Sequence, residues 1–142
     1  MTAVHEIGLS MSWLYSTLSS DSTLAGLAGG GIWRAMAPPT VTTYPLIVFS
    51  FQAGTDLTTI NGYRIWSNHL FQIRAVGPAS STAAIVNAAS RVDVLLGRAS
   101  GTPTGGIIYS CIRESPLAFD ELVNGVLFSN IGNLCRLLVQ QA

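Results

Sequence analysis

Residues 45–96 constrain the fold more than any other part of the chain. Aromatic and β-branched side chains alternate with others over Pro45–Ala53, which is the period of a β-strand. Asn61-Gly62 is a strong signal for a tight hairpin turn. A long strand over Tyr63–Val76 follows, and after Gly77-Pro78 an apolar stripe predicts a helix over Ser81–Leu96. This stretch therefore predicts a β-hairpin followed by a helix that packs against it.

The hairpin around Asn61-Gly62 is longer than a compact domain needs. Strands usually run for about 5–6 residues, and Tyr63–Val76 greatly exceeds that length. Gly54–Ile60 is polar and rich in threonine, which is typical of an exposed extension. We therefore expect an arm over Thr55–Trp66 that projects beyond the domain and contacts a neighbouring molecule.

The first segment of the chain is predicted to be an amphipathic helix with Thr2 as its N-cap. Its core face consists of apolar residues spaced by three and four positions: Val4, Ile7, Met11, Leu14 and Leu18. Leu9 and Trp13 form a second apolar stripe beside that face. Two interpretations of this stripe remain open, a subunit contact and a wider core face.

The rest of the chain contains shorter elements and clear breaks. They are a short helix over Thr23–Ala28 ended by Gly29-Gly30-Gly31, an edge strand over Ile32–Met36, a flexible loop over Ala99–Gly106, a strand over Ile107–Glu114, a bend at Ser115-Pro116, a second hairpin signal at Asn124-Gly125 and a final strand through Leu134–Val139. The pattern of Leu117–Val123 is ambiguous.

Taken together, these elements predict one α+β domain over residues 1–142. We expect a largely antiparallel sheet with two main helices on one face and a projecting β-hairpin arm.

The content of charged residues is unusually low for a chain of this kind. Only 10% of residues are charged, against roughly 25% in an ordinary globular domain. All seven basic residues are arginine, and the formal net charge is zero. Arginine is enriched and lysine depleted at protein interfaces. This composition predicts association with further copies of the chain.

The same composition argues against several other functions. A neutral chain without a basic run is a poor nucleic-acid binder. No apolar run approaches the ~20 residues that cross a bilayer, and the sequence MTAVHEIG is not typical of a secretory signal. We therefore expect neither a sequence-reading DNA-binding protein nor a membrane protein.

No group of residues predicts an enzyme, a metal site or a cofactor. His5 and His69 are far apart and lack an obvious orienting partner, so a core or interface role is expected for His69. Cys111 and Cys135 have no metal-ligand spacing; they could pair, but free buried thiols are expected in a reducing compartment. The three glycines at 29–31 lack the Gly-Lys-Ser/Thr ending of a phosphate loop.

The charged side chains give no catalytic pair either. On a strand, Asp120 and Glu121 would point to opposite faces of the sheet, which does not suit a glycosidase pair. Arg64, Arg74 and Arg136 fall in predicted strands. They are expected to be solvated or ion-paired, with a surface that faces DNA or a subunit boundary as the alternatives.

The order of motifs resembles a known family. A helix ending in Ser-Asp-Ser-Thr-Leu precedes Gly-Gly-Gly-Ile-Trp, Ala-Pro-Pro and Tyr-Pro-Leu-Ile-Val-Phe. A threonine-rich arm with Ile-Asn-Gly-Tyr-Arg then leads to Phe-Gln-Ile-Arg-Ala and to a helix from Ser-Ser-Thr-Ala-Ala to Val-Asp-Val-Leu-Leu-Gly. This order resembles the tail terminator, or tail completion, proteins of long-tailed bacteriophages, the minor-tail-protein-U-like group. The part after Gly97 matches least distinctly.

The resemblance implies a structural virion protein rather than an enzyme. Such proteins form a ring, usually of six subunits, on the head-proximal end of the tail tube, where they stop tube polymerisation. The implied partners are other copies of the chain, the tail tube protein, a neck or head-completion protein and, in a contractile tail, the sheath; DNA passes non-specifically through the lumen. The implied location is the phage tail or neck, after assembly in the host cytoplasm.

The resemblance supplies no motif residues that can be transferred as a site. Interface residues are therefore chosen from the enrichment of aromatic residues and arginine at interfaces. They are Leu9, Trp13, Trp33, Arg34, Asp56, Tyr63, Arg64 and Trp66. Two alternative functions stay open: a head-completion or neck ring protein, and a small α+β enzyme or ligand-binding domain unrelated to phages.

Overall fold

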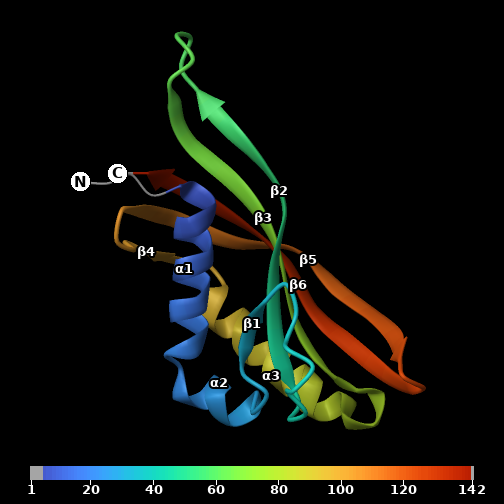
Figure 1. Cartoon of the computed structure of the whole chain (residues 1–142). Helices are drawn as coiled ribbons and strands as arrows, with labels where there is room; N and C mark the ends of the chain where they lie inside the picture. The colour runs from blue at the N-terminus through green and yellow to red at the C-terminus, as the bar shows by residue number, and fades with distance from the viewer. Residues whose placement is uncertain (1–4, 142) are drawn as a thin grey trace.

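The computed structural model describes residues 5–141 of the chain (Figure 1). Its helices are α1 (Glu6–Ser19), α2 (Ser22–Leu27) and α3 (Thr82–Leu96), with a short 3-10 turn over Ala79–Ser81 before α3. Its strands are β1 (Ile32–Arg34), β2 (Leu46–Thr58), β3 (Arg64–Pro78), β4 (Ala99–Gly101), β5 (Gly106–Val123) and β6 (Val126–Gln141).

The six strands form one sheet in the order β1-β2-β3-β6-β5-β4. All neighbouring strands are antiparallel except β1, which runs parallel to β2. The largely antiparallel α+β architecture predicted from the sequence is therefore confirmed. The expected flexible loop over Ala99–Gly106 is wrong in its first part, because Ala99–Gly101 pairs with β5 as the edge strand β4.

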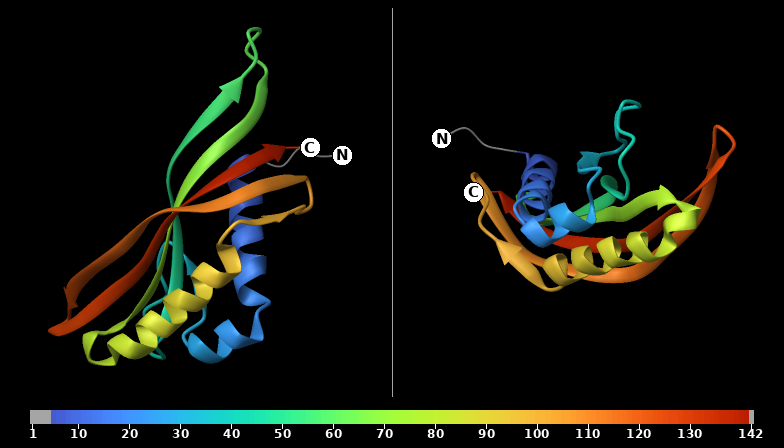
Figure 2. Two further views of the ribbon diagram at one scale, coloured as in Figure 1. Left: turned by 180° about the vertical axis from the view of Figure 1, so that it is seen from behind. Right: turned by 90° about the horizontal axis from the view of Figure 1, so that it is seen from below.

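The three helices and one face of the curled sheet enclose the main core (Figure 2). The alternation of β3 decides which side chains enter it, since Phe71, Ile73 and Ala75 are at most 1% exposed. Leu137 and Val139 of β6 contribute to the same layer. This is the face assignment that the sequence period predicts for β3.

Leu9 and Trp13 of α1 also lie in this core, with exposed fractions of 1% and 8%. The prediction that they contact a neighbouring subunit is therefore replaced by the alternative, a wider core face. The physical reason is that α1 is flanked by α2, β5 and β6 as well as β3, so a second stripe of its surface is covered. Val4 and the predicted N-cap Thr2 lie outside the described residues; His5 caps α1 by accepting the Ile7 amide at 3.2 Å.

A second, smaller apolar cluster lies on the opposite face of the sheet. Leu46, Val48 and Val76 are buried there beneath Trp33 and Tyr44, together with other residues of the segment that joins β1 to β2. The helices leave this face open, as predicted, but the connection between β1 and β2 closes its lower part. The side chains of β2 are consequently buried on both faces from Leu46 to Phe49.

Candidate assembly surfaces

Two long hairpins extend from the sheet in different directions (Figure 1). The first arm comprises residues 53–66 of β2 and β3 with the turn between them. The second arm comprises residues 112–134 of β5 and β6, with Asn124 and Gly125 in the turn at φ values of 50° and 79°. The first arm was predicted from the sequence, and the second was indicated only by its turn.

The length of β5 was missed because of Ser115-Pro116, which was expected to bend the chain. The strand instead continues to Val123. Its pairing with β6 shifts register between Arg113 and Ser115, which accommodates Pro116. Proline is tolerated at an edge or a bulge, where its missing N–H breaks no ladder bond. Leu117–Val123, whose pattern was ambiguous, is strand.

The first arm stands free of the rest of the sheet. The register between β3 and β6 begins at Ser67, so the arm residues of β3 pair only with β2. At the tip, the side chains of Ile60 and Tyr63 are 105% and 74% exposed. Two large apolar groups at the end of a free hairpin are costly to leave in water, which favours a contact with another molecule.

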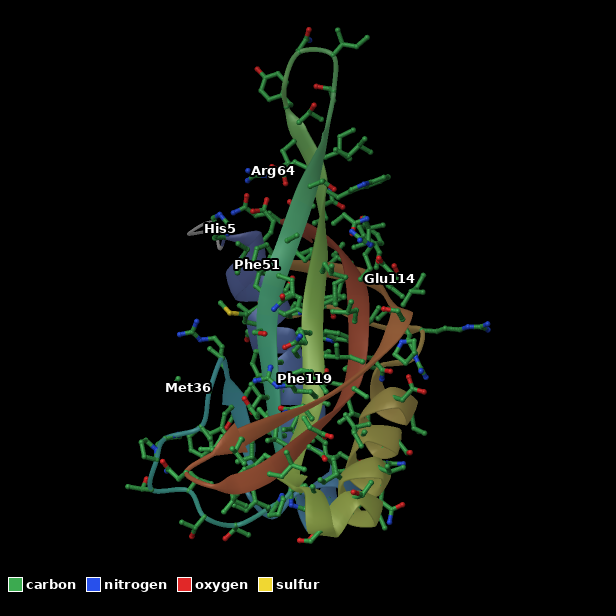
Figure 3. The ribbon with its side chains drawn as sticks, turned by 90° about the vertical axis from the view of Figure 1, so that its right-hand side faces the viewer. His5, Met36, Phe51, Arg64, Glu114 and Phe119 are labelled. Atoms are coloured by element: carbon green, nitrogen blue, oxygen red, sulfur yellow. The ribbon has the colours of Figure 1, made fainter. Side chains whose placement is uncertain are left out.

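An ion pair holds this arm against α1. The Arg64 Nε lies 2.6 Å from the Glu6 Oε1, and the carboxylate side chain is only 4% exposed while the guanidinium is 42% exposed (Figure 3). Asp56 also turns back to the arm, where its Oδ1 accepts a hydrogen bond from the Ser67 hydroxyl. The charged side chains thus fix the direction of the arm more than they mark a binding site.

A small cavity of about 170 Å³ lies beside this ion pair, lined among others by His5, Phe51 and His69. The Ser10 hydroxyl lies 2.7 Å from the His69 Nδ1. Burial lowers the pKa of His69, and the charges of Glu6 and Asp56 oppose that change. A Ser–His pair can in principle supply a nucleophile and a base.

This Ser–His pair does not have the accessibility that catalysis requires. Ser10 is 0% exposed and His69 is 4% exposed, so the hydroxyl cannot reach a substrate carbonyl. The hydrogen bond joins α1 to β3 in the core, and Phe51 packs edge-on against the imidazole with ring centroids 5.5 Å apart. His69 is a hydrogen-bonded core histidine, which is one of the two roles expected from the sequence.

Besides Asp56, three of the predicted interface residues lie in the first arm. Tyr63 and Arg64 are exposed there, and Trp66 is partly buried with its ring edge-on to Tyr109 at 6.5 Å between centroids. Trp33 and Arg34 lie apart from them on β1. The Trp33 indole is fixed by donating to the Gly30 carbonyl at 2.8 Å, while Arg34 is exposed.

The second arm, unlike the first, is held by a third strand of the sheet. Along β6, residues from Phe128 onward pair with β3 as well as with β5. Arg74 of β3 donates to the Asn130 Oδ1 at 2.9 Å, and its guanidinium lies 5.8 Å from the centre of the Phe119 ring (Figure 3). Its apolar tip is exposed, with Leu122 at 71%.

Arg64, Arg74 and Arg136 all have partners within the chain, which agrees with the expectation that they are solvated or ion-paired. Arg64 binds Glu6, Arg136 binds Glu114 at 2.6 Å, and Arg74 binds side-chain amides. The Arg136 hydrogen bond lowers the pKa of Glu114, so this pair stays charged through the ordinary pH range. These side chains give no continuous basic surface for a DNA backbone.

Within residues 5–141 no three metal-ligating side chains converge on one point. Cys111 and Cys135 are free and buried, and the hydrogen bond between the two thiols together with burial raises the pKa of Cys111. In the same part of the chain, no helix has the length and apolar character needed to span a bilayer.

Comparison with known proteins shows a structural likeness across almost the whole chain. No family model matches the sequence, and no curated protein does. A chain from the virion of a native gene transfer agent (GTA) particle superposes with a TM-score of 0.67 at 24% sequence identity, covering 89% of this chain and 90% of the other. The α+β fold is thus one that also occurs in a chain from a gene transfer agent virion.

Proposed function

We propose that this protein is a structural component of a virion. The observation that most supports this proposal is the structural likeness, over 89% of the chain, to a component of a gene transfer agent virion. Two projecting arms with exposed apolar tips and a surface with few charges are what a subunit of a larger assembly needs. Its location in this proposal is the particle, after assembly in the host cytoplasm.

Within the virion, we propose the role of a ring-forming tail terminator. Copies of the chain, six in the family that it resembles, would sit on the head-proximal end of the tail tube and stop its growth. The opposite surface of the ring would dock to neck or head-completion proteins, and DNA would pass through the lumen without being read. The role requires no cofactor and no catalytic step.

The first arm is the proposed contact with a neighbouring subunit or the tail tube. Tyr63 and the exposed part of Arg64 would supply the aromatic and guanidinium contacts that dominate interface energies. Trp66 and Asp56 would position them from the base of the arm. Trp33 and Arg34 would serve a separate contact at the β1 edge of the sheet.

Removing the gene from the producing genome tests this role directly. Without a terminator, we expect tubes of uncontrolled length beside heads that lack tails, seen by electron microscopy. Tails of normal length beside tailless or leaking heads would instead indicate a head-completion or neck ring protein. Complete, functional particles would overturn the virion proposal, and a small-molecule enzyme or binding role would then have to be tested. Complementation with the intact gene is the control.

A further inference from the structure

The two long strands of the arms each have an outer edge that is only partly covered. On β2, the pairing with β1 spans Ile47 to Phe49, and the Phe49 carbonyl accepts the last described backbone hydrogen bond on that side, from Ala35 at 2.9 Å. From Ser50 to Thr58, no described residue pairs with the outer edge. That is about 30 Å of strand.

The other side of the sheet ends in the same way. On β5, the short strand β4 pairs only as far as Cys111, whose carbonyl accepts from the Arg98 amide at 2.9 Å. Beyond it, no described residue pairs with the outer edge of β5 up to Val123. Pro116 lacks an N–H, so the uninterrupted part of this edge is Leu117–Val123.

The segments Phe51–Thr58 and Leu117–Val123 contain no lysine and no proline, two of the usual protections of an edge, although the β2 ladder shifts register between Phe51 and Ala53 and between Leu57 and Thr58. Natural edge strands are blocked by lysines, prolines or inward-pointing charges. The uncovered part of β2 contains no lysine, arginine or proline, and its one acid, Asp56, is bonded to Ser67. On β5, Asp120 accepts from Ser129 at 2.7 Å and Glu121 accepts from Asn130 at 3.2 Å, so both carboxylates are directed back to β6.

We propose that the β2 edge over Phe51–Thr58 of one copy pairs with the β5 edge over Leu117–Val123 of the next copy, which continues the sheet from subunit to subunit. The two edges lie at opposite sides of one sheet and have similar lengths. Further copies of the chain cover both the β2 edge and the β5 edge with a single kind of contact, whereas a strand from another protein would cover only one of the two edges. Such a head-to-tail contact repeats, and it closes into a ring when the rotation between copies permits.

The shape of the sheet supplies a rotation between successive copies. Figure 2 shows the sheet curled around its helical face, and adjacent strands in a sheet are rotated by about 20–25°. If the sheets of two copies pair edge to edge, the curl of the sheet continues from one subunit into the next. Each subunit is then rotated relative to its neighbour, which favours a closed ring. This inference rests on the self-assembly in the proposed function and names the surfaces that perform it.

Cysteine cross-linking tests the contact on the full-length chain. Thr55 and Ala118 are exposed on the two edges, and the native Cys111 and Cys135 are buried. The double variant Thr55→Cys, Ala118→Cys should give a ladder of covalent oligomers with a short bis-maleimide, and an equimolar mixture of the two single variants should give dimers alone. Each single variant by itself should give none.

The remaining outcomes separate this inference from the proposed function. Cross-linking of Thr55→Cys with itself would show symmetric β2 pairing and overturn the inference. Oligomers by mass photometry without any cross-link would also overturn it while leaving self-assembly intact. A chain that stays monomeric at high concentration and on tail tubes would overturn the self-assembly as well.

A charge variant gives an independent measurement. Leu57→Lys places a cation on the β2 edge and should raise the concentration for half-assembly by about tenfold or more. Val94→Lys on α3 is the matched control, since Val94 is an exposed valine at 68%, and should assemble like the parent. An equal effect of the two substitutions would contradict pairing through the β2 edge. Circular dichroism verifies that both variants fold.

Discussion

The two arms share a hairpin design but differ in how they are supported. The first arm pairs only within itself above Ser67 and is tied to α1 by the Glu6–Arg64 ion pair. The second arm shares β6 with β3 for most of its length and carries a ladder of polar contacts on the outer face of the sheet. The first arm can change its direction to fit a partner at little cost in free energy, because it pairs with no other strand. A movement of the second arm would displace β6 and therefore the core strand β3.

Close backbone packing should produce the largest difference between the arms. A Cβ at Gly132 in the second arm would lie 2.0 Å from the Ile73 carbonyl oxygen, whereas a Cβ at Gly54 in the first arm would come no closer than 3.2 Å to the side chains of His69 and Phe51. We expect Gly132→Ala to lower the free energy of unfolding by about 3 kcal/mol or more and Gly54→Ala by about 1 kcal/mol or less. Urea denaturation measures both; equal losses would contradict the comparison.

Loss of the ion pair between the first arm and α1 should have the next largest effect. Arg64→Met leaves the buried Glu6 carboxylate without its partner, which should cost about 1–3 kcal/mol of stability. Glu6→Gln should cost less, because the half-exposed Arg64 guanidinium can be rehydrated. Chemical unfolding at neutral pH compares the two variants. A larger loss of stability in Glu6→Gln than in Arg64→Met would contradict the idea that the unpaired buried carboxylate is the main cost.

The pH dependence of stability should report on the same region. Because the pKa of His69 is lowered in the folded state, the neutral form is favoured there, and its stabilising effect is complete above the unfolded value near 6.5. Stability should therefore fall as the pH decreases below 6.5 towards the lower folded value. Glu6, Asp56 and His5 are the charged or titratable side chains that face the imidazole.

His69→Gln isolates this contribution. The variant should be less stable at neutral pH but should lose less additional stability between pH 7.5 and 5 than the parent. Unfolding in urea at each pH gives the two slopes. Parallel slopes would assign the pH dependence to other groups in the chain.

Replacing the tip of the first arm should have the smallest effect on stability. Thr58 pairs with Arg64, so substituting Asn-Gly for residues 59–63 keeps the strand register and the ion pair to Glu6. We expect an unfolding free energy within about 0.5 kcal/mol of the parent, because the tip contributes no buried side chain. Incorporation into particles, measured by quantitative immunoblotting of purified virions, should nevertheless decrease.

A comparable change in the second arm sharpens the contrast. Leu122→Ser with Leu127→Ser removes two exposed apolar groups but leaves the Asn124-Gly125 turn in place. If both tip variants enter particles normally, neither tip contacts a partner. A defect limited to the first arm would assign the flexible hairpin as the docking element.

Local pattern was sufficient for most of the fold. The helix stripe of Ile85, Ala88, Val92 and Leu96 is buried as its spacing indicates. The turns at Asn61-Gly62 and Asn124-Gly125 lie where their dipeptides predict, with Gly62 and Gly125 at positive φ. These features depend on the conformational preferences of a few adjacent residues, which the sequence states directly.

The candidate surfaces were predicted less well. Tyr63 and Arg64 are exposed on an arm, as an interface residue must be, but Leu9 and Trp13 are core residues. An apolar stripe on a helix has the same sequence signature whether a neighbouring element or a neighbouring molecule covers it. Only the positions of α2, β5 and β6 around α1 distinguish the two.

The sequence by itself therefore determined the helices, most of the strands, the hairpin turns and the scarcity of charge. The tertiary structure decided the parallel pairing of β1, the contact between Glu6 and Arg64, the anchoring of the second arm and the two uncovered strand edges. Each of these depends on contacts between residues far apart in the chain, and the free energy of such a contact is set by the shape and burial of the assembled core. Local conformational preference carries no information about that shape, so the uncovered strand edges and the anchoring of the second arm could be recognised only in the tertiary structure.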